Sequence, residues 1–253
     1  PAVTTADQLA ELRRVQAETG RRCAVYFSER LESRATERAG RLVADGAVGA
    51  VVQVVGFGPH RLGIDDRPPW FFEPAHNGGI LNDLASHQIE QILHFTGHDD
   101  GDLRDVEVVA PMVANRAHPD HPGLEDYGEV HLRTPTAAGT VRVDWFTPAG
   151  LPTWGDVRLF VVGTEGTIEV RKNCDLGGRD GGDHLLLVDG RGVRHFDCRQ
   201  DPLPFADRLF ADLRDGTETL MAQAHTLAVC ELALRAQTEA VRAGHLATGA
   251  GHG

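Results

Sequence analysis

Apolar residues recur at helical spacing near the start of the chain and then give way to short apolar runs. Over residues 5–19, three apolar positions lie between a Thr-Gln capping box and a glycine, a pattern that predicts a helix. The run RCAVYF at 22–27 predicts a short buried strand. A second helix is expected over roughly 30–45, and AVGAVVQVVGFG at 47–58 predicts another strand.

After a long irregular segment at 58–79, which contains three aromatic residues and several prolines, a helix is expected over about 79–95. The pattern then becomes one of strands, with hairpin turns at GTEG (163–166) and DGRG (189–192). Helices are expected again near 202–214 and 217–242. This order predicts an α+β fold, in which an antiparallel sheet carries helices on one face.

Composition narrows the possible functions. The chain has 253 residues, a net charge of −12 and a sequence pI near 5.5, which argues against a nucleic-acid partner because phosphate binding requires a basic surface. No segment is long and apolar enough to span a membrane. The four cysteines are scattered and show no metal-binding spacing, so a reducing cytoplasm is the expected location.

The helix in GGILNDLASHQIEQILHFTG (78–97) holds the clearest candidate chemistry. Asp83 and His87 are four residues apart, so they lie on one helical face. A carboxylate beside an imidazole suits a general base, and the paired glycines would let backbone approach a ligand. The alternative is an ordinary surface pair. An opposite apolar stripe requires the two polar side chains to face solvent or a cleft: it comprises Leu81, Ala85, Ile89, Ile92 and Leu93.

Aromatic, arginine and histidine side chains gather in two other segments. GPHRL and RPPWFF contain His60, Arg61 and Trp70, and a later loop contains Trp154. Such side chains can stack on a sugar and hydrogen-bond its hydroxyls, so these four residues are candidates for binding a sugar or polyol. A structural role, in which aromatics anchor a long loop, is an equal alternative.

Two histidine-containing segments resemble metal sites only superficially. HQIEQILH is not the HExxH motif and lacks a third ligand, and HPDHP (118–122) reads as a proline-bounded turn. No metal site is therefore expected. No GxGxxG occurs either, so no dinucleotide-phosphate loop can be assigned.

Taken in order, FSER, GAVGAVVQV, PHR, WFF, GGILNDLASHQIEQIL and GTEGTIEV resemble the Gfo/Idh/MocA oxidoreductases across essentially the whole chain. The resemblance implies a Rossmann domain that binds NAD or NADP, followed by a substrate domain with a large, mostly antiparallel open sheet. It implies oxidation or reduction of a sugar, inositol or related polyol. His87 would exchange a proton with the reacting hydroxyl, Asp83 would orient that group, and Arg30 would lie near substrate and nicotinamide.

The chain also departs from the family pattern. Pro1 aligns with the proline of the family's Glu-Lys-Pro motif, so the lysine and the glycine-rich loop would precede the chain. The resemblance therefore divides the chain into the last helix and strand of a nucleotide domain (1–27), a substrate-binding and oligomerisation domain (28–245), and a flexible tail (246–253). The expected function is that of the substrate-binding C-terminal portion of an NAD(P)-dependent oxidoreductase.

Two other functions stay open. The chain could be a non-catalytic binding or oligomerisation protein derived from the family. Alternatively, Asp83 and His87 could perform acid/base chemistry without a cofactor. Relatives often pair through the open sheet, so a homo-oligomer is expected.

Overall fold

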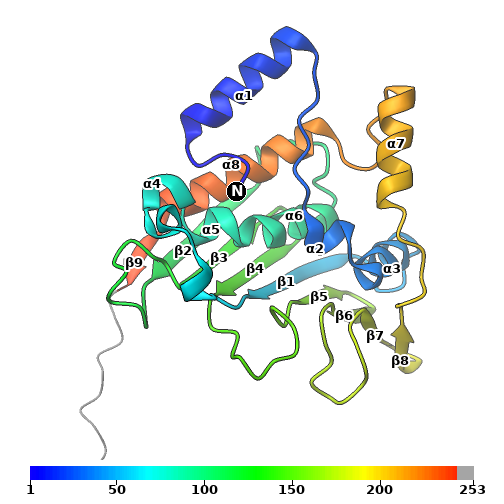
Figure 1. Cartoon of the computed structure of the whole chain (residues 1–253). Coiled ribbons are helices and arrows are strands. Elements are labelled where there is room, and N and C mark those ends of the chain that lie inside the picture. The colour runs from blue at the N-terminus through cyan, green and yellow to red at the C-terminus, as the bar shows by residue number, and fades with distance from the viewer. Residues whose placement is uncertain (244–253) are drawn as a thin grey trace, which may run out of the picture.

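A nine-stranded sheet organises the chain, and the computed structural model describes residues 1–243 (Figure 1). The strand order is β8-β7-β6-β5-β1-β4-β3-β2-β9. Only the pairs β1–β4 and β2–β9 are parallel, which confirms the mostly antiparallel sheet. The strands are β1 (Val51–Pro59), β2 (Glu107–Ala114), β3 (Tyr127–Arg133), β4 (Ala138–Asp144), β5 (Arg158–Gly163), β6 (Gly166–Arg171), β7 (His184–Asp189), β8 (Gly192–Asp197) and β9 (Val241–Ala243).

Helices cover one face of this sheet, as the sequence predicts (Figure 1). The helices are α1 (Ala6–Thr19), α2 (Ser28–Leu31), α3 (Arg34–Ala44), α4 (Pro74–Asn77), α5 (Ile80–Asp83), α6 (Ala85–Thr96), α7 (Phe205–Asp215) and α8 (Gln223–Glu239), with 3-10 turns η1 (Ile64–Asp66) and η2 (Pro69–Phe72). The helix expected over 30–45 is thus split into α2 and α3. The last helix begins at Gln223, later than expected. The expected tail at 246–253 lies outside the described residues.

Small residues in the sheet let α5 and α6 pack closely onto it. A Cβ on Gly56 or Gly58 of β1 would lie 2.8 or 2.7 Å from the side-chain amide of Gln88, and one on Gly139 of β4 would lie 2.7 Å from Ile92. Side chains that follow each other at this spacing line one face of a strand. The glycines of VVGFG therefore create a groove that positions α6 and, with it, His87.

The first helix forms as predicted, but the strand expected at 22–27 does not. Thr5 caps α1 by accepting a hydrogen bond from the Gln8 backbone, and Gly20 ends it in a left-handed conformation. Residues 20–27 then connect α1 to α2 without joining the sheet. The backbone N–H of Cys23 donates instead to the side chain of Gln223 at 2.7 Å, and that of Phe27 donates to Val25. The apolar side chains of this connecting segment pack between helices. An apolar run in a sequence does not by itself show whether the segment is a strand or a buried connection.

In the part of the chain that the structure describes, no helix packs on the opposite face of the sheet (Figure 1). Phe57 of β1 and Phe160 of β5 lie on it with ring centroids 6.0 Å apart, and the Arg142 guanidinium lies 5.5 Å from the Phe57 ring. Both phenylalanines are half-buried, and charged side chains surround them. Within residues 1–243, no helix has the length and hydropathy needed to cross a membrane.

Candidate functional site

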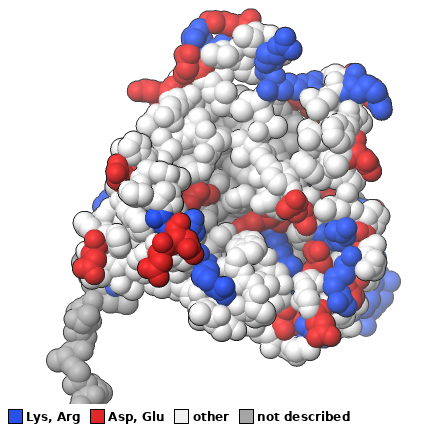
Figure 2. Space-filling view, in the orientation of Figure 1, with Lys and Arg blue, Asp and Glu red and all other residues white. Residues whose placement is uncertain are grey.

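Asp83 and His87 line a pocket of about 360 Å³, as their shared helical face predicts. Asp83 ends α5 and His87 lies in the first turn of α6, while the predicted apolar stripe on the other side is fully buried. The connection between α1 and α2, residues 24–27, forms the facing wall. Figure 2 shows this side of the molecule hollowed between α1 and α7, with mostly uncharged walls.

The imidazole of His87 is held by a ring contact. The ring of the buried Phe27 packs against it in a T-shaped arrangement, with centroids 5.9 Å apart and planes at 89°. The Nδ1 atom of His87 is buried and has no hydrogen-bond partner among residues 1–243. Nε2 makes no hydrogen bond to these residues and is not fully buried, so it is the nitrogen accessible from the pocket. A neutral imidazole of this kind can take up one proton from a bound molecule.

Asp83 does not hydrogen-bond to His87 in this structure. Its side chain is one-third exposed, and Oδ1 lies 3.3 Å from the Pro1 amino nitrogen. The carboxylate and the imidazole thus face the same space while remaining separate. Both can reach a ligand in the pocket, the first as a hydrogen-bond acceptor and the second as a base.

His60 does not line this pocket, but it lies close enough for the charges of Asp83 and His87 to act on its ring. Burial lowers the pKa of His60, although the charges of Glu29 and Asp83 oppose this effect. Its Nδ1 lies 3.0 Å from the Gly58 carbonyl, which can only accept, so Nδ1 carries the hydrogen and Nε2 of the neutral ring is left as an acceptor. The half-exposed Trp154 lies against this ring, with centroids 4.4 Å apart. His60 and Trp154 therefore form a polar-aromatic wall near Asp83 and His87.

Arg61 and Trp70 are placed differently. Arg61 is exposed, and its guanidinium donates to the carbonyls of Leu151 and Thr153 at 2.6 and 3.0 Å, which fixes the loop that carries Trp154. Trp70 is 52% exposed and contacts Phe71. Neither residue lines the pocket that holds His87. Their contacts are of the kind expected if these side chains anchor a long loop.

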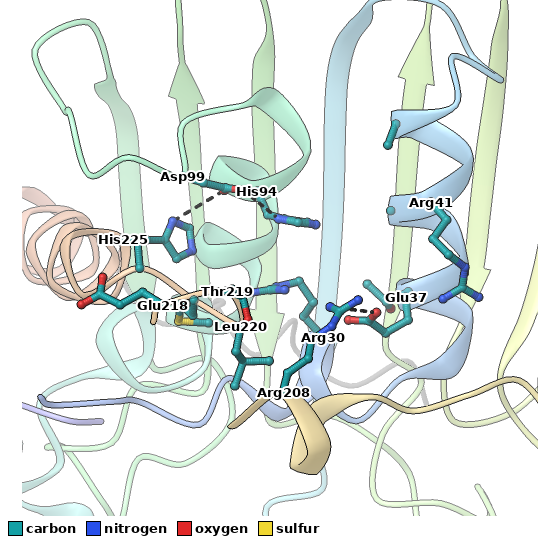
Figure 3. Close-up of a pocket in the computed structure, with 15 residues that line it drawn as sticks. Arg30, Glu37, Arg41, His94, Asp99, Arg208, Glu218, Thr219, Leu220 and His225 are labelled. Carbon is teal, nitrogen blue, oxygen red and sulfur yellow. Dashed lines mark hydrogen bonds and ion pairs between the residues drawn. The ribbon is translucent and has the colours of Figure 1, made fainter. Parts of the chain in front are cut away.

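Arg30 lines a second pocket of about 360 Å³, shown in Figure 3, and does not line the first. Its Nε donates to Glu90 Oε1 at 2.5 Å, and both side chains are buried. His225 also approaches that oxygen, at 3.2 Å, and pairs with Asp99 at 3.7 Å. The Glu90 carboxylate thus lies inside the protein, between an arginine and a histidine.

The paired glycines before α5 also differ from expectation. A Cβ on Gly79 would lie 2.2 Å from the Gln237 side chain, so protein fills the space that was expected to admit a ligand. Gln237 accepts from the Leu81 N–H, and Glu125 accepts from the Ile80 N–H. These two side chains satisfy the start of α5, which explains why the backbone must pass so close.

Sequence reasoning missed a buried polar network beneath α6. Lys172 donates to Gln91 Oε1 at 2.6 Å and lies 3.6 Å from Glu29, which also accepts a hydrogen bond from Gln88. Burial lowers the pKa of Lys172 to about 8, against the opposing effect of Glu29. The sequence offers one signal for this network, since Lys172 is the only lysine of the chain.

No metal site is found within residues 1–243: no three His, Cys, Asp or Glu side chains converge suitably there. In the HPDHP segment, His118 pairs with the buried Asp126 at 2.9 Å. From the sequence, we interpreted this segment as a proline-bounded turn and not as a metal site.

The residues around His87 fit the reacting end of a nicotinamide-dependent site. They combine a base with an open nitrogen, a carboxylate and a pocket of sufficient size. The sequence contains no glycine-rich phosphate loop, so none of these residues can be assigned to the pyrophosphate of a dinucleotide.

Comparison with known proteins shows the family to which this chain belongs. The GFO/IDH/MocA C-terminal domain model matches residues 36–169, which is more than half of the chain. A protein from Erwinia carotovora atroseptica SCRI1043, assigned as an oxidoreductase, is 43% identical with a TM-score of 0.90, over 96% of this chain and 71% of that one. No match is found among curated proteins.

Two more distant structures share the fold. Aldose-aldose oxidoreductase from Caulobacter crescentus, complexed with glycerol, is 19% identical with a TM-score of 0.70, over 94% of this chain and 68% of that one. Levoglucosan dehydrogenase, in complex with NADH and levoglucosan, is 15% identical with a TM-score of 0.69, over 94% and 70%. The family model and the 43% identity together show that this chain belongs to the GFO/IDH/MocA family of oxidoreductases.

Proposed function

We propose that this chain is the substrate-binding portion of an NAD(P)-dependent oxidoreductase that acts on a hydroxyl of a sugar, inositol or related polyol. The observation that carries the proposal is His87, whose Nε2 is accessible from a pocket that it shares with Asp83. Two structures of the same fold support the choice of ligands, since one holds glycerol and another holds NADH with levoglucosan.

In the oxidation direction, His87 Nε2 accepts the proton of the reacting hydroxyl while the carbon loses a hydride. That hydride would be accepted by the ring of a nicotinamide, when one is bound. Asp83 accepts a hydrogen bond from the substrate and favours the imidazolium that forms, because a nearby negative charge stabilises a cation. Phe27 keeps the imidazole ring oriented through its T-shaped contact.

His60 and Trp154 are proposed to hold the rest of the substrate. The neutral His60 offers Nε2 as an acceptor for a second hydroxyl, and the indole of Trp154 offers an apolar face for the ring hydrogens. Three candidates are not included among the substrate contacts. Arg30 pairs with Glu90, Arg61 binds the carbonyls of the loop at 151–153, and Trp70 lines neither the pocket of His87 nor the pocket that contains Trp154.

The test uses the product of the complete reading frame that encodes these residues. NADH or NADPH formation is measured with a panel of sugars and cyclitols. His87→Asn should lower kcat by about 10²- to 10⁴-fold while polyol binding persists, since general-base catalysis contributes about that much. His76→Asn, in the exposed helix α4, is the matched control and should leave turnover unchanged.

The outcomes separate the three candidate functions. Full turnover by His87→Asn would contradict the proposed role. Turnover without any nicotinamide, lost in that variant, would favour cofactor-independent acid/base chemistry. Polyol binding without turnover under any condition would favour a non-catalytic protein.

We also propose that a second copy of the chain covers the open sheet face. The aromatic pair Phe57 and Phe160 is bordered by Arg142. Aromatic residues and arginine are enriched in protein–protein interfaces, so this face has the composition of one. Light scattering after gel filtration should give at least twice the mass of one chain. A monomer at micromolar concentration would contradict this arrangement.

A further inference from the structure

A third pocket, of about 170 Å³, lies beside the site of His87 and contains the only lysine of the chain. Its walls come from the start of α2, the loop before β5 and the residues after β6; they include Ser28, Glu29, Trp154, Lys172, Asn173 and Asp183. The walls are fixed by hydrogen bonds. Asn173 accepts from the Val157 N–H at 3.1 Å, and Asp183 accepts from Ser33 and from the backbone of Ala35.

Two buried groups in this pocket have unused hydrogen-bonding capacity. Glu29 Oε1 is buried and has no partner among residues 1–243, while Oε2 accepts from Gln88. The Lys172 ammonium has three hydrogens, but its contacts are Gln91 at 2.6 Å and Glu29 at 3.6 Å. A buried carboxylate oxygen without a partner is costly, so a hydroxyl that donates to Glu29 would be bound firmly.

Trp154 adds an apolar surface to these polar groups. It is 47% exposed and belongs both to this pocket and, through its contact with His60, to the wall near His87. The backbone also joins the two pockets, because Phe27 lines the first and the next two residues line the third. One molecule could therefore extend from the imidazole of His87 toward Lys172.

The local charge selects among possible ligands. Lys172 is accompanied by three carboxylates that line the same pocket, Glu29, Glu32 and Asp183. An anionic ligand would be repelled by this excess of negative charge. An uncharged ring with neighbouring hydroxyls suits the combination of a carboxylate, an amine, an amide and an indole face.

We propose that Glu29, Lys172 and Trp154 form a binding subsite for one uncharged polyol ring, a pyranose or a cyclitol. One ring hydroxyl donates to Glu29 Oε1 and accepts from Lys172 Nζ, and the ring stacks on Trp154. This inference rests on the proposed function in one respect, that the bound ring is also the substrate of the site at His87.

The test is calorimetric titration of the 253-residue chain with D-glucose, D-galactose and myo-inositol, alongside D-gluconate and D-glucose 6-phosphate. At least one uncharged ring should bind more tightly than both anions. Glu29→Gln should weaken that binding about tenfold or more, because hydrogen bonds to charged groups are the stronger ones. Glu125→Gln, which removes a buried carboxylate elsewhere, is the matched control.

Trp154→Ala guards against a folding defect, since this side chain is half-exposed. It should weaken binding severalfold, whereas Phe210→Ala, at an exposed aromatic of α7, should not. A deoxy sugar lacking the bridging hydroxyl should bind wild type weakly and lose nothing further in Glu29→Gln, as expected for a shared interaction.

Unchanged binding in both Glu29→Gln and Trp154→Ala, tighter binding of the anions, or no binding of any ring would overturn the subsite. None of these results depends on turnover. Conversely, full turnover by His87→Asn would overturn the proposed reaction and leave ring binding at Glu29 intact, so the two failures can be distinguished.

Discussion

The guanidinium of Arg30 and the carboxylate of Glu90 meet inside the protein, with 2.5 Å between Nε and Oε1, although the residues are 60 positions apart. This pair joins α2 to α6, and α6 carries His87 on another side. Its geometry therefore links the segment that follows α1 to the helix that positions the candidate base.

Removing one partner of this pair should strongly destabilise the fold. Arg30→Met leaves the Glu90 carboxylate buried without its main counter-charge, for which a loss of about 3–5 kcal/mol in the free energy of unfolding is expected. Urea denaturation measures the loss. Replacing Arg14 by Met, in an exposed pair with Glu11, should change the midpoint little.

The double variant Arg30→Met/Glu90→Met provides the second comparison. It removes both charges, so it should recover much of the stability that Arg30→Met loses. A double variant that is less stable than either single variant would contradict this expectation. It would show that the two side chains stabilise the fold mainly by their packing and not by compensating each other's charge.

Acid should weaken the fold through Glu90. Burial alone would raise the pKa of Glu90, but Arg30 and His225 overcome this effect and lower it from 4.5 to about 2. The lowered pKa means that the carboxylate stabilises the fold fully above pH 4.5 and that this contribution, on the order of 3 kcal/mol, is lost as the pH falls toward about 2. Chemical denaturation at a series of pH values should show a shallower decline in Glu90→Gln than in wild type. Parallel curves would contradict the assignment.

Filling the groove beneath α6 should displace the helix. A Cβ at Gly56 would lie 2.8 Å from Gln88 Oε1 and 3.0 Å from its Cβ, so Gly56→Ala should cost about 1–3 kcal/mol of stability by overpacking. Gly150→Ala is the control, because nothing lies within 4 Å of its added Cβ. Thermal unfolding compares the two, and equal stability would mean that α6 can shift without strain.

Periodicity was enough to place Asp83 and His87 at a pocket, because helical spacing alone decides which side chains share a face. It also predicted the sheet and the helices on one of its faces. The strand at 22–27 was wrong, since an apolar run does not reveal whether a neighbouring strand exists to pair with it.

The polar residues of α6 could not be placed from the sequence. Gln88, Glu90 and Gln91 look like solvent-facing positions, yet all three are fully buried. Their partners, Glu29, Arg30 and Lys172, are 59, 60 and 81 residues away. Only the fold brings those charges beneath the helix, so the polar network follows from tertiary structure and leaves no local signature.

None of the twelve residues of α6 is exposed. One side meets the sheet glycines, others meet the Glu29–Lys172 network and the Arg30 ion pair, and the remaining one borders the pocket of His87. Only Leu9 of the surface helix α1 is buried, whereas eight of the twelve residues of α6 are buried against their neighbours. Genetic drift in this protein should therefore leave α6 nearly untouched, and variation within it should come as compensated pairs with α2 or the end of β6.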